Sequence, residues 1–276
     1  MSDPLPSPDN SSMSRPALPP LPRGLPPPQQ MTLEVSEVED LGPNLRQIRL
    51  VGADLVGFAF LPGQDLMLRL PGPAGTLVSR RYSIRRADRA GGSADLNVVM
   101  HGDGPAARWA KAAGPGGPPL EVTGPRGKIT LDPSADWHVF LGDETYIPAA
   151  LALLEALPRG RRGWAALEVE GAEDEQPLDP AAEVELQWLH RGAVRPGDGS
   201  RLWDWLEARP QRGGTGHFYV AAEVSVALGL RDRLLRLGVS RNQVSAKAYW
   251  SRTRANAPRG EPDEDEVVGT PGPASL

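Results

Sequence analysis

The sequence predicts a two-domain α+β protein, in which an antiparallel six-stranded β-barrel is followed by an α/β domain with a mostly parallel sheet. Between residues 31 and 133, short alternating apolar segments are separated by turns rich in Gly and Pro, a pattern typical of an antiparallel barrel or sandwich. From residue 137 onward, strand-like segments alternate with helical ones, as in βαβ units that build a parallel sheet.

The composition also divides the chain into four regions. The Pro-rich tail over residues 1–30 and the acidic tail over residues 257–276 hold too little apolar surface to offset the entropy of ordering, so we expect both to be disordered. We expect the barrel domain over residues 31–134 and the α/β domain over residues 135–256.

Individual elements follow from the hydrophobic periodicity. The barrel strands are expected at residues 32–38, 45–51, 65–70, 81–85, 96–101 and 120–123. In the second half, strands are expected at residues 138–141, 164–169, 184–189, 218–221 and 243–250, and helices at residues 148–157, 202–208 and 225–237.

The composition excludes several classes of protein. The formal net charge is −5, whereas a nucleic-acid binder carries a basic surface. The chain has no cysteine, which excludes disulfides, thiolate metal sites and a thiol nucleophile. Its four histidines are not spaced as paired ligands, so we expect no metal held by the protein itself. Because no apolar run approaches the ~20 residues of a membrane span and the N-terminus lacks the features of a signal peptide, we expect a cytoplasmic protein.

One strand-like segment of the first half reads SRRYSIR and contains an Arg-x-Tyr-Ser pattern. Tyr82 and Ile84 alternate with polar residues, which predicts a strand that turns Arg81, Ser83 and Arg85 toward its other face. A phenol beside a hydroxyl suits a flat heteroaromatic ring with polar edges, and a neighbouring guanidinium can bind phosphate through two hydrogen bonds. An ordinary strand with solvated arginines has the same short pattern.

Two strand-to-helix turns have features of a binding site. The first, over residues 101–110, has glycines followed by Pro105 at a first helical position, so its backbone N–H groups can bind an anion such as a pyrophosphate. The second, over residues 141–149, opens the α/β half, where nucleotides bind, but Asp143 and Glu144 would repel a phosphate. We expect this turn to contact an uncharged group, such as a nicotinamide or its ribose. A plain helix cap by Asp143 or Thr145 is also consistent with the sequence.

Together these motifs resemble the siderophore-interacting protein family of FAD-dependent ferric-siderophore reductases, which is related to the ferredoxin–NADP reductase superfamily. The resemblance covers about residues 31–254. The matching segments are residues 80–85, 104–110, 124–127, 142–145 and 187–191, and Tyr249-Trp250 with Arg252 and Arg254.

The resemblance implies a protein that passes electrons from NADH or NADPH through bound FAD to a ferric siderophore and releases Fe(II) in the cytoplasm. We expect a monomer. Chemistry would run through the flavin, with no catalytic side chain and no metal ligand of the protein. The implied FAD-binding residues are Arg80, Arg81, Tyr82, Ser83, His101, Gly104, Pro105, Ala106, Ala107 and Trp109. The implied NAD(P)H-binding residues are Gly142, Asp143, Glu144, Thr145, Ala222 and Glu223, and the implied siderophore-binding residues are Arg126, Lys247, Tyr249, Trp250 and Arg252, with Lys128 and Arg254 as further basic candidates.

The chain also departs from the family pattern. Ala222 stands where a glycine is usual and adds a Cβ where nicotinamide should pass, and Tyr146 replaces a small residue. These changes leave open a flavin-binding module without productive nicotinamide use, a module that receives electrons from a ferredoxin, or a plain flavin reductase. Glu168 and Glu170 favour the free 2′-hydroxyl of NADH, whereas the nearby cations favour the 2′-phosphate of NADPH. Those cations are Arg159, Arg161 and Arg162.

Overall fold

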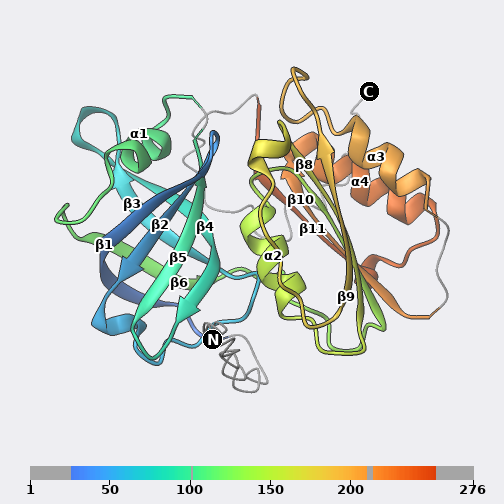
Figure 1. Ribbon diagram of the computed structural model, residues 1–276, viewed down its shortest axis with the longest axis horizontal. Coiled ribbons are helices and arrows are strands. Elements are labelled where there is room, and N and C mark those ends of the chain that lie inside the picture. The colour runs from blue at the N-terminus through green and yellow to red at the C-terminus, as the bar shows by residue number, and fades with distance from the viewer. Residues whose placement is uncertain (1–25, 101, 210–213, 253–276) are drawn as a thin grey trace, which may run out of the picture.

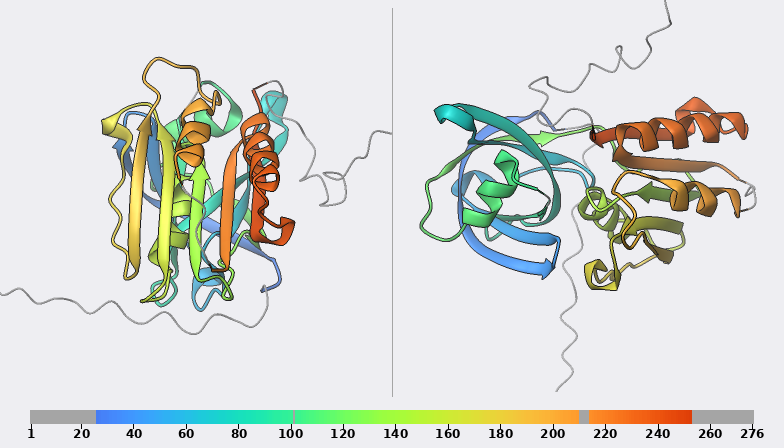
Figure 2. Two further views of the ribbon diagram at one scale, coloured as in Figure 1. Left: turned by 90° about the vertical axis from the view of Figure 1, so that its right-hand side faces the viewer. Right: turned by 90° about the horizontal axis from the view of Figure 1, so that it is seen from above.

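The computed structural model describes residues 26–100, 102–209 and 214–252. Within these residues the chain forms a β-barrel and an α/β domain that lie side by side, with helix α2 between them (Figures 1 and 2). The barrel half comprises β1 (Gln29–Gly42), β2 (Leu45–Val51), β3 (Asp65–Pro71), β4 (Leu77–Asp88), β5 (Ser93–Val99), α1 (Pro105–Ala112) and β6 (Leu120–Arg126). The α/β half comprises β7 (Trp137–Gly142), α2 (Ile147–Glu155), β8 (Arg162–Val169), β9 (Glu183–His190), α3 (Ser200–Glu207), β10 (Gly216–Glu223), α4 (Val224–Arg236) and β11 (Val244–Trp250).

In the described part of the chain, six antiparallel strands close the barrel in the order β1-β2-β5-β4-β3-β6. Apolar side chains at every second position of β1 and β3 point inward, because successive residues of a strand face opposite sides. Leu33, Leu66 and Leu68 are fully buried in this core, and closure removes the free edges that an open sheet would expose.

The second half contains a parallel sheet with strand order β11-β10-β7-β8-β9. Strand β10, which has a neighbour on each side, is buried along its whole length, as expected for a parallel strand covered on both faces. Helices α3 and α4 cover the face of the sheet that points away from the barrel (Figure 2). The predicted fold class is therefore confirmed.

Helix α2 covers the other face of the sheet and lies against the barrel (Figure 1). Its sequence, IPAALALLE, is apolar nearly all the way round, which is the pattern of a helix buried on every side. Residues from Ile147 to Leu154 are all buried. The carboxyl ends of β7 and β10 therefore lie close to the barrel, and this arrangement positions the candidate site.

Most of the observed strands are longer than predicted, whereas β2 has the predicted bounds and β11 begins one residue later. β4 extends from Leu77 to Asp88, although the alternation covered only residues 81–85, because its ends pair with β3 and β5 through backbone hydrogen bonds that need no apolar side chain. β5 ends at Val99, and the predicted continuation to His101 falls partly outside the described residues. None of the helices among the described residues is long and apolar enough to cross a membrane.

Candidate functional site

Strand β4 carries the Arg-x-Tyr-Ser pattern along the boundary between the domains. Tyr82 and Ile84 pack against the barrel core, and Tyr82 lies 6.3 Å from the ring of Trp109 on α1. Arg81, Ser83 and Arg85 face the α/β domain, so the predicted division of the strand into two faces is confirmed. Arg85 is buried there, which rules out a solvated surface arginine at this position.

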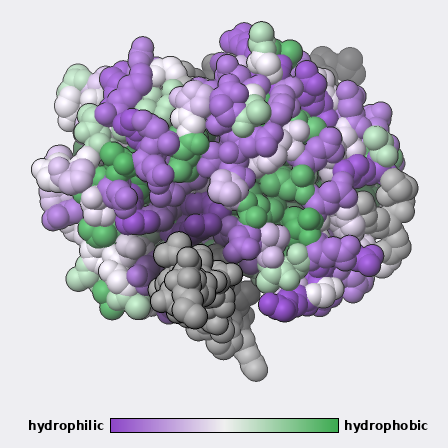
Figure 3. Space-filling view, viewed as in Figure 1, coloured by the Kyte–Doolittle hydropathy of each residue, from purple (hydrophilic) through white to green (hydrophobic). Residues whose placement is uncertain are grey.

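The polar face of β4 is held by ion pairs and one long hydroxyl contact. Arg81 binds Asp65 of β3 through two hydrogen bonds of 2.8 and 2.7 Å. Ser83 Oγ lies 3.4 Å from the hydroxyl of Tyr249 on β11, across the domain boundary. In the view of Figure 3, hydrophilic residues line much of the region between the two domains. The boundary near Arg81 and Ser83 is thus polar, as a nucleotide-type cofactor requires.

Helix α1 offers an anion site at its start. Gly104 precedes Pro105 in an extended conformation, and among the described residues no side chain caps the helix and no acidic residue lies in its first turn. A Cβ added at Gly104 or Gly102 would meet no described atom within 4 Å. The free backbone N–H groups and the helix dipole therefore face open space. His101, which was predicted to contribute here, lies outside the described residues.

These observations fit an FAD. The uncapped helix start suits its pyrophosphate, and the phenol of Tyr82 with the hydroxyl of Ser83 suits its ring system. Burial raises the pKa of the Tyr82 phenol above its ordinary value, so the side chain stays a neutral hydroxyl. Ala106 and Trp109, also predicted for this site, pack against the barrel core, while Ala107 is buried in the helix.

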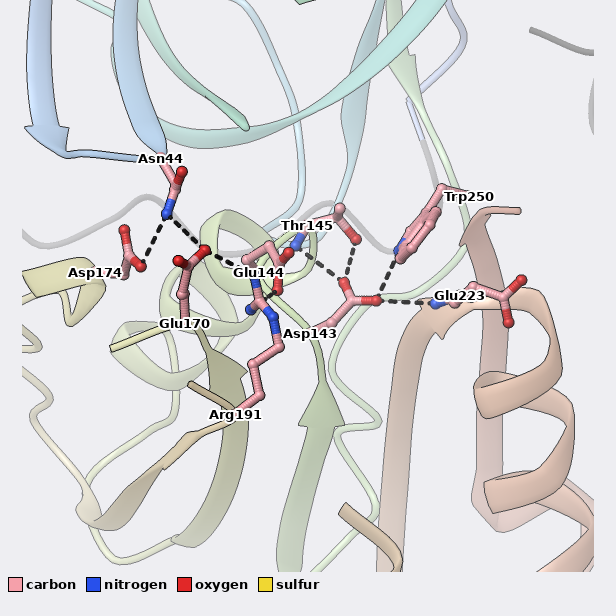
Figure 4. Close-up of polar contacts among 9 residues, drawn as sticks. All are labelled: Asn44, Asp143, Glu144, Thr145, Glu170, Asp174, Arg191, Glu223 and Trp250. Carbon is pink, nitrogen blue, oxygen red and sulfur yellow. Dashed lines mark hydrogen bonds and ion pairs between the residues drawn. The ribbon is translucent and has the colours of Figure 1, made fainter. Parts of the chain in front are cut away.

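In the turn after β7, hydrogen bonds within the protein hold the Asp143 side chain. Asp143 is 2% exposed and accepts four hydrogen bonds from described residues (Figure 4). Thr145 donates two of them, from its backbone N–H at 3.0 Å and its hydroxyl at 2.5 Å. The Glu223 N–H donates at 2.9 Å and the Trp250 indole N–H at 2.7 Å. Asp143 thus ties together the carboxyl ends of β7, β10 and β11, and its acceptor sites are taken up inside the protein. Burial, with Glu144 next to it, raises the pKa of Asp143 to about 6.

Glu144 also turns inward, into an ion-pair network that reaches the barrel. Arg191, at the end of β9, is buried and donates to Glu144 at 3.0 Å and to Glu170 at 3.3 Å (Figure 4). Asn44, in the turn between β1 and β2, donates to Glu170 and to Asp174, both at 3.3 Å. Glu170 therefore contributes to the contact between the domains.

Glu168 remains without a hydrogen bond or ion pair among the described residues, although it is only 2% exposed. Burial raises its pKa to about 7, and the charges of Glu144, Asp143 and Asp198 add to this effect while Arg191 opposes it. It lies near the carboxyl end of β8, where an acidic group can accept hydroxyl hydrogens.

Replacing Glu168 with glutamine is expected to stabilise the protein at pH 8 by on the order of 2 kcal/mol and to have little effect near pH 5. Folded Glu168 keeps its proton up to about pH 7, whereas a glutamate in the unfolded chain loses it near pH 4.5. The folded state therefore binds more protons in that window, and the free energy of unfolding falls as the pH rises through it. Urea unfolding of both proteins at the two pH values measures the effect. Glu173→Gln, at an exposed position, is the control, and an equal gain at both pH values would contradict the assignment.

The two residues that depart from the family pattern, Ala222 and Tyr146, are both buried in the core of the α/β domain. The methyl group of Ala222 is buried beneath α3 and α4, on the face of the sheet away from the barrel. Tyr146 is fully buried between α2 and the sheet, edge-on to Tyr249 at 5.8 Å, and its hydroxyl has no described hydrogen-bond partner. The arginines expected to favour a 2′-phosphate precede or begin β8, at the opposite edge of the sheet, where Arg161 pairs with Asp136 and Arg162 with Glu183.

The predicted siderophore-binding residues divide into two groups. Lys247 and Tyr249 face the barrel, where the Lys247 amine lies 3.7 Å from Asp65 and 5.6 Å from the Tyr249 ring centre. Trp250 and Arg252 lie at the carboxyl edge of the sheet, against Asp143 and Glu223. Arg126, at the end of β6, lies near the first group, because it is the register partner of Asp65 on the neighbouring strand β3. Arg254 lies outside the described residues.

Sequence reasoning missed two carboxylates that organise this boundary. Asp65 holds Arg81 and lies beside Lys247, and Glu155, at the end of α2, binds Arg85 through two hydrogen bonds of 2.8 Å. Asp65 lies on the strand next to that of Arg81, and Glu155 lies in the other domain from Arg85. The only local signal is a charged residue at the end of the otherwise apolar α2.

Comparison with known proteins matches both halves of the chain in order. The siderophore-interacting FAD-binding domain matches residues 71–129, and the siderophore-interacting protein family model matches residues 135–253. The ferric vibriobactin reductase ViuB of Vibrio cholerae is 29% identical over 231 residues, which cover 76% of this chain and 84% of ViuB. An uncharacterized protein of Mycobacterium tuberculosis is 34% identical over 186 residues, or 63% of this chain, and the match spans only 65% of that relative's length.

Among solved structures, a siderophore utilization protein from T. fusca superposes with a TM-score of 0.77 at 30% identity. The superposition covers 85% of this chain and 97% of the T. fusca protein. Because a relative of this identity is matched over nearly its whole length, and the barrel carries the family's FAD-binding domain, the chain belongs to the siderophore-interacting protein family.

Proposed function

We propose that the chain is an FAD-dependent ferric-siderophore reductase, which takes electrons from NADH or NADPH, acts as a monomer and releases Fe(II) in the cytoplasm. The observation that carries the proposal is the uncapped start of α1 facing open space beside Tyr82 and Trp109, in a chain that is similar to a ferric vibriobactin reductase. The iron belongs to the substrate, so the protein needs no ligand set of its own.

Three groups of residues hold the cofactor in this proposal. The N–H groups of Ala106 and Ala107 bind the pyrophosphate, with Gly104 leaving room for it. Arg80 supplies a cation beside the phosphates, and Tyr82 and Ser83 bind the ring system. The chemistry that FAD would supply at this site is acceptance of a hydride from a nicotinamide and delivery of single electrons to Fe(III). The protein orients the ring and excludes water, using the packing of Tyr82 on Trp109 and the closed boundary at Arg85.

The nicotinamide donor would approach the carboxyl ends of β7 and β10, over the turn of residues 142–145. The acidic side chains at the end of β8 favour the free hydroxyls of NADH over the phosphate of NADPH, and the arginines near the start of β8 lie at the wrong edge to compensate.

A second candidate is a flavoprotein of the same family that receives electrons from another donor, such as a ferredoxin. Its support is that Asp143 has its acceptor sites filled and that Tyr146 is fully buried, so the turn after β7 presents few groups to a nicotinamide.

An anaerobic absorbance experiment tests both candidates. The full chain is loaded with FAD, NADH and NADPH are added in turn, and a ferric siderophore follows, with Fe(II) trapped by a chelator. Bleaching by either nucleotide and reoxidation by the ferric chelate, with Fe(II) released, support the reductase. Bound flavin that neither nucleotide bleaches supports the second candidate, and a protein that takes up no FAD contradicts both.

Replacing Lys247 with glutamine is expected to raise KM for an anionic ferric chelate about tenfold at low salt, because Lys247 places a cation on the barrel-facing side of β11. Arg252→Gln is the matched control, since the Arg252 N–H and guanidinium lie against Glu223 and Ser225 at the other edge. Steady-state reduction of a triscatecholate chelate at two ionic strengths makes the comparison. Equal changes in the two variants would contradict this placement of the substrate.

A further inference from the structure

The barrel-facing surface of the α/β sheet carries a polar chain that the proposed reductase does not use. Ser245 at the start of β11, His217 at the start of β10 and Asp132 in the connection between β6 and β7 are linked in series. In the parallel register, Ser245 lies opposite Tyr219, two residues beyond His217 on the neighbouring strand. Odd-numbered residues of both strands therefore share one face.

The distances correspond to a nucleophile, a base and an orienting carboxylate. Ser245 Oγ lies 2.9 Å from His217 Nε2, and His217 Nδ1 lies 3.3 Å from Asp132 Oδ2. A carboxylate can only accept, so the proton is assigned to Nδ1, and Nε2 is left to accept the hydroxyl hydrogen of Ser245. This is the order of roles by which a serine is activated in unrelated folds.

The carboxylate that orients His217 is itself held in place. Asp132 Oδ1 accepts from the Ser134 N–H at 2.9 Å and the Ser134 hydroxyl at 2.6 Å. The Asp132 N–H donates to the Tyr219 hydroxyl at 2.8 Å, and that hydroxyl lies 3.2 Å from His138 Nδ1. Hydrogen bonds from Ser134 keep the pKa of Asp132 below its usual value, so it remains a carboxylate. Asp132 is thus fixed by neighbours that are themselves bonded.

The base is buried and the nucleophile is reachable. His217 is 7% exposed, and burial lowers its pKa, which keeps the imidazole neutral and able to accept a proton. Ser245 is half-buried, and the Asp132 side chain is 31% exposed. Lys247 lies two residues farther along the same face of β11, where its amine is 3.7 Å from Asp65.

We propose that Ser245 is an activated nucleophile, with His217 as its base and Asp132 as the residue that orients His217, and that it takes an acyl group from small carboxylate esters. The Ser245 oxygen forms a bond to the ester carbonyl carbon while His217 takes the hydroxyl proton. The bond from that carbon to the alcohol oxygen then breaks, and His217 returns the proton to the departing alcohol. Water, deprotonated by His217, releases the acid and restores Ser245.

The test uses the full FAD-loaded chain and a fluorophosphonate, whose phosphorus–fluorine bond is broken as the serine oxygen attaches to phosphorus. Mass spectrometry of the digested protein is expected to find the adduct on Ser245. Labelling is expected to be absent at this position in Ser245→Ala and about 100-fold slower in His217→Gln. Ser36→Ala removes an exposed serine on β1 that bonds the backbone of Arg49, and is expected to label like the unchanged protein.

Hydrolysis of p-nitrophenyl acetate provides the second readout, and it is expected to be lost in Ser245→Ala while flavin absorbance is retained. Asp132→Asn, expected to be slower than the unchanged protein, replaces His217→Gln if that variant does not fold. No adduct on Ser245 in the unchanged protein would overturn the proposal. So would labelling of Ser245 in His217→Gln at the unchanged rate, which would leave the hydrogen-bond chain a purely structural role.

Discussion

Replacing Glu155 with alanine is expected to lower the free energy of unfolding by about 3–5 kcal/mol. Glu155 ends α2 and binds Arg85 of β4 through two hydrogen bonds of 2.8 Å, and both side chains are 6% exposed. Removing the carboxylate leaves a buried guanidinium without its counter-charge, which costs far more than the pair itself contributes. Urea unfolding followed by circular dichroism and by tryptophan emission measures the loss.

A matched control comes from the second cation at the same carboxylate. Arg86 also contacts Glu155, at 3.2 Å, but its side chain is 52% exposed. Arg86→Ala is therefore expected to cost at most about 1 kcal/mol. The double variant Arg85→Met with Glu155→Leu, which removes both buried charges together, is expected to recover most of the stability lost by Glu155→Ala. Similar losses from Glu155→Ala and Arg86→Ala would show that the Arg85 pair is not what joins the domains.

The fold could be predicted because its signals are local. Alternation along the barrel strands and the switch to strand–helix alternation after residue 137 each depend on neighbouring residues, and both were confirmed. The strand ends could not be predicted, since β4 continues past its apolar residues through pairing with β3 and β5. Pairing of this kind joins segments far apart in the sequence.

Local sequence patterns predicted candidate residues of the site but not the partners that hold them. The sequence predicted binding roles for Arg81, Ser83 and the start of α1, and it assigned Asp143 to a ligand without the hydrogen bonds that this side chain accepts from three segments of the protein. Tyr249 and Trp250 were grouped together, although adjacent residues of a strand face opposite sides. This difference in direction could have been predicted from the two-residue period of a strand. The ion-pair partners Asp65 and Glu155 could not be predicted from the sequence, because only the fold brings them to Arg81 and Arg85.

Replacing Gly104 with aspartate is expected to weaken FAD binding about 100-fold while stabilising the protein without FAD. Gly104 has φ −63° and ψ 163°, a conformation that any residue can adopt, and an added Cβ would meet no described atom within 4 Å. An aspartate at this position caps α1 and stabilises it by about 0.3–0.5 kcal/mol relative to glycine. The same carboxylate brings a negative charge to the N–H groups proposed for the pyrophosphate, and repulsion of a few kcal/mol between charges about 4 Å apart gives the loss in affinity.

Gly104→Asn separates the charge from the cap. Asparagine caps a helix about as well as aspartate but is neutral, so it is expected to stabilise the protein without FAD to a similar degree and to weaken FAD binding much less. Flavin fluorescence titration gives the affinities, and thermal unfolding of the flavin-free protein gives the stabilities. If the two variants lost affinity equally, the cause would be the added bulk, and the pyrophosphate would not bind through the helix dipole. If the helix start is left uncapped for an anionic ligand, the aspartate variant gains stability without FAD and loses much of its affinity for FAD, whereas the asparagine variant keeps most of that affinity. If the helix start simply lacks a capping residue, both variants gain stability and neither loses affinity through its charge.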